Sequence, residues 1–236
     1  MTIDTWFASP EPETPGLTGG DIDVWKIGLD AGPEILAASR RLLSESESAR
    51  AARYRRPADG ERFTVAHGRL RVILGRYAGI RPEALEFAAG KRGKPRLVRA
   101  GQCEDLSFSL SYAGAMAIVA VAAGREVGVD AEPLHAENDL PLLAEACLSP
   151  AERALFDSAT PARRARLFYT FWTRKEAYLK AQGVGLGVEP RTVDLSTPGP
   201  TPDGRWFVRD IGDDYPFPIA LATECPPGCV RVMELT

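Results

Sequence analysis

The chain has 236 residues, of which 44% are hydrophobic and 26% are charged, and its formal net charge is −3 at pH 7. This length is enough for one large domain or two small ones with a buried core. Acidic and basic residues are nearly balanced, and no apolar run reaches the length of a membrane span. We therefore expect neither a nucleic acid nor a membrane as a partner.

Residues 1–20 are predicted to form a flexible arm, because they are rich in proline, glycine, threonine and glutamate. They lack the basic segment and apolar core of a secretory signal, and we expect a cytoplasmic protein. The only histidines, His67 and His135, argue against a histidine-based triad or zinc site. Cys225 and Cys229 are close in the sequence, but no second cysteine pair at metal-binding spacing accompanies them. All four cysteines are expected to be reduced: Cys103, Cys147, Cys225 and Cys229.

Strands are predicted in the first half from period-two alternation and apolar runs at 21–30, 85–97 (strand, turn, strand), 106–114, 116–124 and 127–132. A helix is predicted at 47–56, beginning at Ser44 or Ser46 and ending at Pro57. A stronger helix is predicted at 61–79, where apolar residues recur at the helical period.

The second half has the same ingredients. Ser149, Pro150 and Glu152 together indicate a helix start with a capping box. A longer helix is predicted from Thr160 to about Ala181. Further strands are predicted at 191–196, 205–211, 218–224 and 230–235. The whole pattern indicates an α+β fold of two similar subdomains with mainly antiparallel sheets, at residues 21–125 and 126–236.

A row of three side chains lies on the long predicted helix. Trp172, Glu176 and Lys180 are spaced i, i+4, i+8 and share one face. One interpretation is an exposed ion pair between Glu176 and Lys180, worth a few tenths of a kcal/mol. The tryptophan favours a partly buried face instead, and the glycines at 183 and 185 would let a ligand approach the backbone closely.

Two carboxylates follow the most apolar stretch of the chain. Asp130 and Glu132 are two residues apart and would point to the same side of a strand, where they repel each other. They could simply protect an edge strand from aggregation. Alternatively, a third carboxylate such as Glu176 would complete a set of oxygen ligands suited to Mg²⁺, with Lys180 one turn on to meet a phosphate.

Five motifs in order resemble the 4′-phosphopantetheinyl transferases of the surfactin-synthetase-activating (Sfp) type. They are "GKPRL" (93–97), "FSLSYAG" (108–114), "GVDAE" (128–132), "LSPAERALF" (148–156) and "FWTRKEAYLKAQGVGL" (171–186). The resemblance covers about residues 21–195. It implies two α/β halves related by a pseudo-twofold axis, with coenzyme A in the cleft between them.

The resemblance also implies a reaction, in which phosphopantetheine moves from coenzyme A to a serine of an apo acyl or peptidyl carrier protein. The enzyme would be monomeric and Mg²⁺-dependent, and it would release adenosine 3′,5′-bisphosphate. Asp130, Glu132 and Glu176 would hold the metal. Glu176 would also act as the base, and Lys180 would stabilise the phosphoryl oxygens.

Contacts to coenzyme A are implied for a set of basic and motif residues: Arg50, Arg62, Lys94, Pro95, Ser111, Tyr112, Lys175 and Lys180. Arg50 and Arg62 could equally be exposed helix arginines, and Lys175 could merely flank Glu176.

One motif departs from the family pattern. Tyr112 stands where the family has a histidine that contacts the 3′-phosphate of coenzyme A, and a tyrosine carries no positive charge. This substitution is the only support for a non-catalytic homologue that binds coenzyme A or a carrier protein. A Mg²⁺-dependent phosphohydrolase or nuclease would need more clustered acids or a basic groove. A structural interaction module would leave the motifs unexplained.

Overall fold

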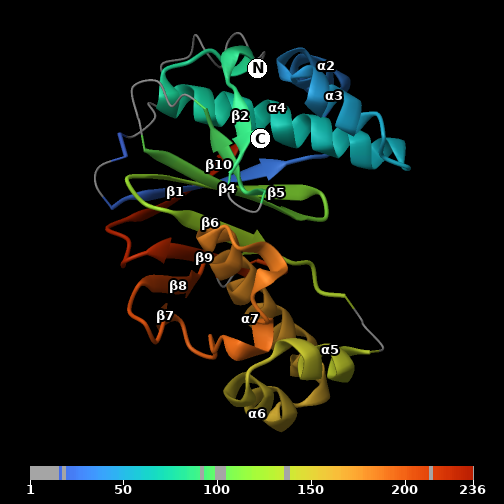
Figure 1. The fold of residues 1–236 in the computed structure, drawn as a ribbon. Coiled ribbons are helices and arrows are strands. Elements are labelled where there is room, and N and C mark those ends of the chain that lie inside the picture. The colour runs from blue at the N-terminus through green and yellow to red at the C-terminus, as the bar shows by residue number, and fades with distance from the viewer. Residues whose placement is uncertain are drawn as a thin grey trace.

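A computed structural model describes residues 16–17, 20–90, 93–98, 105–135, 139–212 and 215–235. The arm expected at 1–20 and Cys103 lie largely or wholly outside these residues. In the described ranges, no helix combines the length and apolar character needed to cross a bilayer. The predicted α+β class is confirmed, since helices and sheets are both present in each half of the chain (Figure 1).

The first sheet has the strand order β10-β1-β5-β4. Its strands are β1 (Ile22–Gly28), β4 (Leu106–Ala113), β5 (Met116–Ala123) and β10 (Val230–Leu235). β10 runs parallel to β1, so the last strand of the chain returns to the sheet of the N-terminal half. The helices on this side are α2 (Pro33–Leu42), α3 (Glu45–Ala51) and α4 (Pro57–Ala78). Figure 1 shows α4 lying along this sheet, and their apolar side chains form one core.

The second sheet has the order β6-β9-β8-β7. Its strands are β6 (Val127–Ala131), β7 (Gly199–Pro200), β8 (Trp206–Asp210) and β9 (Ile219–Glu224). The helices are α5 (Leu140–Cys147), α6 (Pro150–Ser158) and α7 (Pro161–Gln182). α7 packs against β6 and β9. Short 3₁₀ turns lie at Pro82–Ala84 (η1), Gly185–Gly187 (η3) and Pro190–Thr192 (η4).

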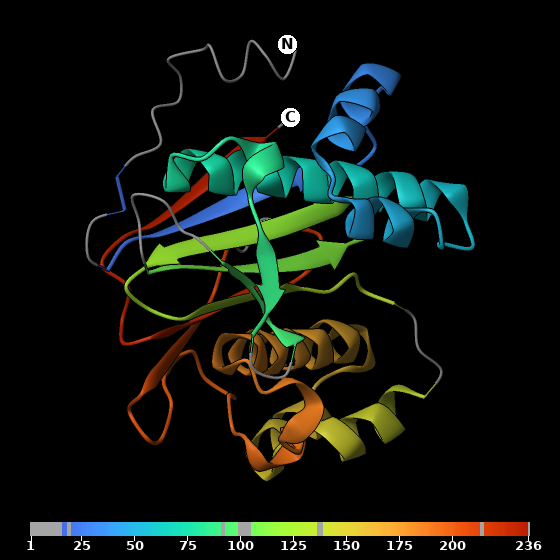
Figure 2. The same cartoon turned by 45° about the horizontal axis from the view of Figure 1, so that its top comes forward.

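A small hairpin joins the two halves at one side. It consists of β2 (Phe87–Ala89) and β3 (Pro95–Leu97). Figure 2 shows it running from α4 across the first sheet toward α7. The two larger sheets also share a buried cluster that includes Ile118 of β5, Val129 of β6 and Leu221 of β9. The halves are therefore packed against each other along both the hairpin and the sheets.

Most predicted elements are confirmed, two helices differ from the prediction in their bounds, and one predicted strand is wrong. The helix predicted at 47–56 begins after Ser44 and ends at Ala51, and the helix predicted at 61–79 begins earlier, at Pro57. Helices α2 and α5 were not predicted. The strand predicted at 191–196 is wrong, because this segment forms η4 and an irregular stretch.

The edge strands β4 and β6 meet through serine hydroxyls. Ser109 Oγ accepts a hydrogen bond from the Val129 N–H at 3.0 Å, and Ser111 Oγ accepts one from the Ala131 N–H at 3.4 Å. On the other side of β6, a Cβ at Gly128 would lie 2.1 Å from the carbonyl oxygen of Ala177. Only glycine fits there, and α7 therefore approaches β6 closely. This approach brings the acids of β6 beside the polar row of α7.

Candidate active site

The predicted acids, the helix row and Ser111 converge where β4, β6 and α7 meet. Asp130 is buried on β6, with 3% of its surface exposed. Its Oδ1 accepts hydrogen bonds from Ser111 Oγ at 2.7 Å and from Lys180 Nζ at 2.5 Å. Lys180 Nζ also donates to Ser111 Oγ at 3.0 Å. Three residues from three elements thus form one closed set of contacts.

The row on α7 lies on a partly buried face, as the tryptophan favoured. Trp172 donates from Nε1 to Glu132 Oε1 at 3.2 Å, which ties the row to the second acid. The alternative of an exposed Glu176–Lys180 ion pair is excluded, because Lys180 pairs with Asp130 and Glu176 Oε1 is buried without a hydrogen-bond partner. Burial, followed by the negative charge of Asp130, raises the pKa of both Glu132 and Glu176. The Asp130 carboxylate therefore lies close enough to disfavour the charged forms of both glutamates.

Two carboxylate oxygens at this site bear on whether it can bind a divalent cation. Asp130 Oδ2 and Glu176 Oε1 are both buried carboxylate oxygens without a partner, and such atoms are costly unless something compensates them. A set of carboxylate oxygens suits Mg²⁺. However, in the described part of the chain no three acidic, histidine or cysteine side chains are gathered at metal-holding spacing. The donor chemistry fits, and the carboxylates would have to close around the ion.

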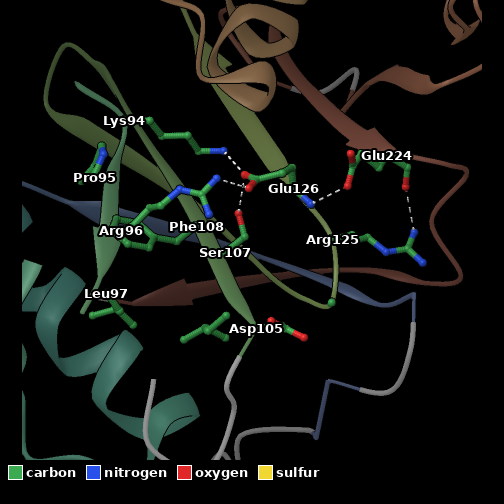
Figure 3. A pocket seen from close by; sticks show the side chains of 12 residues that line it. Lys94, Pro95, Arg96, Leu97, Asp105, Ser107, Phe108, Arg125, Glu126 and Glu224 are labelled. Carbon is green, nitrogen blue, oxygen red and sulfur yellow. Dashed lines mark hydrogen bonds and ion pairs between the residues drawn. The ribbon is translucent and has the colours of Figure 1, made fainter. Parts of the chain in front are cut away.

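Lys94 lies at the hairpin, and its three N–H donors are all used. Nζ donates to Glu126 Oε2 at 2.7 Å, to the Val127 carbonyl at 3.0 Å and to the Ala181 carbonyl at 3.2 Å. Figure 3 shows Lys94 and Arg96 both directed at Glu126. Pro95 begins β3 beside them, and these residues line a cavity of about 360 Å³. Lys94 therefore anchors the hairpin to β6 and the end of α7.

Arg50 and Tyr112 lie near each other on the helical side of β4. The Arg50 guanidinium is 5.2 Å from the centre of the Phe63 ring. Burial raises the pKa of Tyr112; the nearby Tyr54 raises it further, and Arg50 lowers it. Tyr112 as a whole residue is still 41% exposed. Arginines at 50, 53 and 55 and Tyr54 line a shallow surface hollow in this region.

A network on α3 and α4 that the sequence reasoning missed holds this corner in place. Glu47 accepts hydrogen bonds from the Ser44 backbone N–H at 2.8 Å and from Arg71 Nε at 2.8 Å, and it contacts His67 Nδ1 at 3.2 Å. Burial alone would raise the pKa of Glu47, but these hydrogen bonds lower it to about 2. Glu47 thereby fixes α3, on which Arg50 lies. The Ser44 and Glu47 spacing of a capping box was the available signal.

Two further residues that were expected to contact coenzyme A, Arg62 and Lys175, have other partners in the structure. Arg62 is paired with Asp30 at 2.9 Å on an exposed part of α4. Lys175 is fully buried and paired with Glu152 at 2.8 Å, and it also donates to the carbonyls of Pro190 and Val193. Its three donors are used, so it has none left for a nucleotide. Lys175 instead fastens α7 to α6 and so sets the direction in which Glu176 points.

Comparisons with known proteins give the family. Residues 126–224 match the family model described as the 4′-phosphopantetheinyl transferase superfamily. The 4′-phosphopantetheinyl transferase HetI of Nostoc sp. is 37% identical over 186 residues, which cover 79% of this chain and 78% of that protein. The 4′-phosphopantetheinyl transferase of Bacillus subtilis is 25% identical over 212 residues, or 85% and 90% of the two chains. The chain therefore belongs to the 4′-phosphopantetheinyl transferase superfamily and is an enzyme of that class.

Proposed function

We propose that this enzyme transfers 4′-phosphopantetheine from coenzyme A to a serine of an apo acyl or peptidyl carrier protein, with Mg²⁺, as in the surfactin-synthetase-activating type. The observation that carries the proposal is the convergence of Asp130, Ser111 and Lys180, with the unpartnered Glu176 oxygen beside them. This arrangement has acids to hold a cation, a carboxylate to take a proton and an ammonium to meet a phosphate.

Glu176, Lys180 and Ser111 each have a separate role in this reaction. The carrier serine oxygen attacks the β-phosphorus of coenzyme A, and the bond from that phosphorus to the bridging oxygen breaks. Glu176 takes the serine proton, for which its unpartnered Oε1 is available. Lys180 donates to the phosphoryl oxygens as negative charge develops on them and on the leaving adenosine 3′,5′-bisphosphate. Ser111 keeps Asp130 in place through its 2.7 Å hydrogen bond.

A divalent cation would be held by Asp130, Glu132 and Glu176. When bound, it would neutralise the pyrophosphate charge as a Lewis acid. The orphaned Oδ2 of Asp130 supports this assignment, because the ion would give it a partner. Glu176 would contribute to the cation only the oxygen that does not take the serine proton.

The terminal 3′-phosphate of coenzyme A is assigned to the corner of Arg50 and Tyr112. A phosphate needs positive charge, which Tyr112 lacks and Arg50 supplies close by. The exposed arginines at 53 and 55 add to the same hollow. Lys94 and Lys175 are left out, since their donors are taken by other groups.

The test is direct. The protein is mixed with an apo acyl or peptidyl carrier protein, coenzyme A and Mg²⁺, and the intact mass of the carrier is measured. We expect the mass to rise by one phosphopantetheine group. The rise should be lost when coenzyme A is left out or EDTA is added, and when the acceptor serine of the carrier is changed to alanine. No mass change with carriers of both kinds would contradict the proposal.

Tyr112→His is expected to widen the preference for coenzyme A over dephospho-coenzyme A by about five- to tenfold at pH 6. An imidazolium bonds a phosphate more strongly than a neutral phenol does, by roughly 1 kcal/mol or more, and it is charged below neutral pH. The measurement is the ratio of kcat/KM for the two donors. Tyr112→Phe is the control, because it removes the hydroxyl without adding charge. An unchanged ratio in Tyr112→His would mean that residue 112 does not face the 3′-phosphate.

A further inference from the structure

Lys180 forms an ion pair with Asp130, the buried carboxylate that would be a central ligand of a cation. Its ammonium lies 2.5 Å from Asp130 Oδ1 and 3.0 Å from Ser111 Oγ, while Ser111 itself bonds the same carboxylate oxygen. Oδ1 thus has two donors, and Oδ2 of the same carboxylate has none. Lys180 therefore compensates Asp130 at the oxygen where a ligand bond could otherwise form.

A divalent cation and the Lys180 ammonium would repel each other if both were bound to Asp130. If Mg²⁺ bound either oxygen of Asp130 while Lys180 stayed in place, the two positive charges would lie within about 7 Å in a largely buried site. Asp130 cannot turn away, since its side chain is only 4% exposed. Lys180 can, because 32% of its side chain is exposed and its stem is flexible.

We propose that Lys180 and a divalent cation compete for Asp130. When the phosphopantetheine donor, coenzyme A, binds, its phosphates attract Lys180 away from Asp130 and relieve this competition. Lys180 then acts as an internal counter-ion until the donor arrives. It follows that the donor and the cation each strengthen the binding of the other, since coupling between two sites is reciprocal. The donor half of this inference rests on the proposed function, whereas competition at Asp130 does not.

The competition is tested with Mn²⁺, which takes the same oxygen ligands as Mg²⁺ and gives an electron paramagnetic resonance signal when free in solution. The free ion is titrated against the whole protein without any donor. We expect Lys180→Met to bind Mn²⁺ about tenfold or more tightly than the unchanged protein, because removing a competing cation 2.5 Å from the carboxylate frees it. Lys180→Arg should bind Mn²⁺ as weakly as the unchanged protein, since it keeps the charge.

Two controls define the site that is measured. Lys26→Met removes a lysine that pairs with Glu234 on the first sheet, and it should leave Mn²⁺ affinity unchanged. Asp130→Asn should abolish the tight binding when it is combined with Lys180→Met. Thermal unfolding of each variant identifies any loss of fold. If folded Lys180→Met binds Mn²⁺ no more tightly than the unchanged protein, the competition is disproved.

The donor half is read from the same titration with coenzyme A present. Coenzyme A should tighten Mn²⁺ binding by a larger factor in the unchanged protein than in Lys180→Met, where Asp130 is already free. Equal factors in the two proteins would overturn the coupling through Lys180. This result is independent of turnover, so failure of the carrier test and failure of this inference can be told apart.

Discussion

Asp130→Asn is expected to lower kcat/KM for phosphopantetheine transfer by at least about 100-fold while the protein remains folded. The asparagine keeps the shape of the side chain and a carbonyl oxygen for Ser111, so the junction of β4 and β6 is preserved. It loses the negative charge that would hold the cation and that pairs with Lys180. The measurement is steady-state transfer to the carrier, together with thermal unfolding of both proteins.

The matched control for this change is Asp157→Asn. Asp157 pairs with Arg153 at 2.9 Å, one turn earlier on the exposed face of α6. Such a pair is worth only a few tenths of a kcal/mol, so activity and stability should barely change. If Asp130→Asn retained near-normal activity when Mg²⁺ is kept below saturation, Asp130 would have to be removed from the ligand set.

Local spacing in the sequence predicted much of the candidate site. Asp130 and Glu132 are two apart on one strand, and Glu176 and Lys180 are one turn apart on one helix, so each pair has a fixed geometry. Helical geometry could also have excluded Lys175. It is one residue from Glu176 and therefore rotated by about 100° around the helix, away from the row of Trp172, Glu176 and Lys180.

Contacts between distant segments could not be predicted in this way. Glu47 meets Arg71 and His67 only because α3 folds back onto α4. Similarly, β10 joins β1 across almost the whole chain, and no local pattern indicates that pairing. Lys180 was predicted to meet a phosphate, but its pairing with Asp130 depends on how closely α7 approaches Gly128.

The wrong strand at 191–196 has a physical explanation. Its sequence alternates as a strand does, but its carbonyl groups are satisfied by buried cations of α7 rather than by a neighbouring strand. Lys175 donates to the Val193 carbonyl, and Arg174 donates to the Leu195 carbonyl at 2.9 Å and to the Ser196 carbonyl at 3.0 Å. A backbone that is satisfied in this way has no need of a sheet.

Glu176→Gln is expected to lower kcat by about 10²- to 10⁴-fold, the usual range for loss of a general base. The amide keeps the size of the side chain and cannot accept the serine proton. Because Lys175 and Glu152 set the direction of α7 independently of residue 176, the helix should stay in place. Without a divalent cation, coenzyme A should still bind within a few-fold of the unchanged affinity, since its phosphates are assigned to Lys180 and to the corner of Arg50 and Tyr112.

The split between kcat and donor binding decides the role of Glu176. Single-turnover transfer and equilibrium binding of coenzyme A are measured on the same preparation, with Glu145→Gln on the exposed surface of α5 as the control. A base that acts only in the chemical step should reduce the first and spare the second. If coenzyme A binding without the cation fell in parallel with turnover, Glu176 would be a positioning residue for the donor rather than the base. If Glu176→Gln turned over normally, the proton would have to leave through another group, and the unpartnered oxygen at the end of Glu176 would need a different explanation.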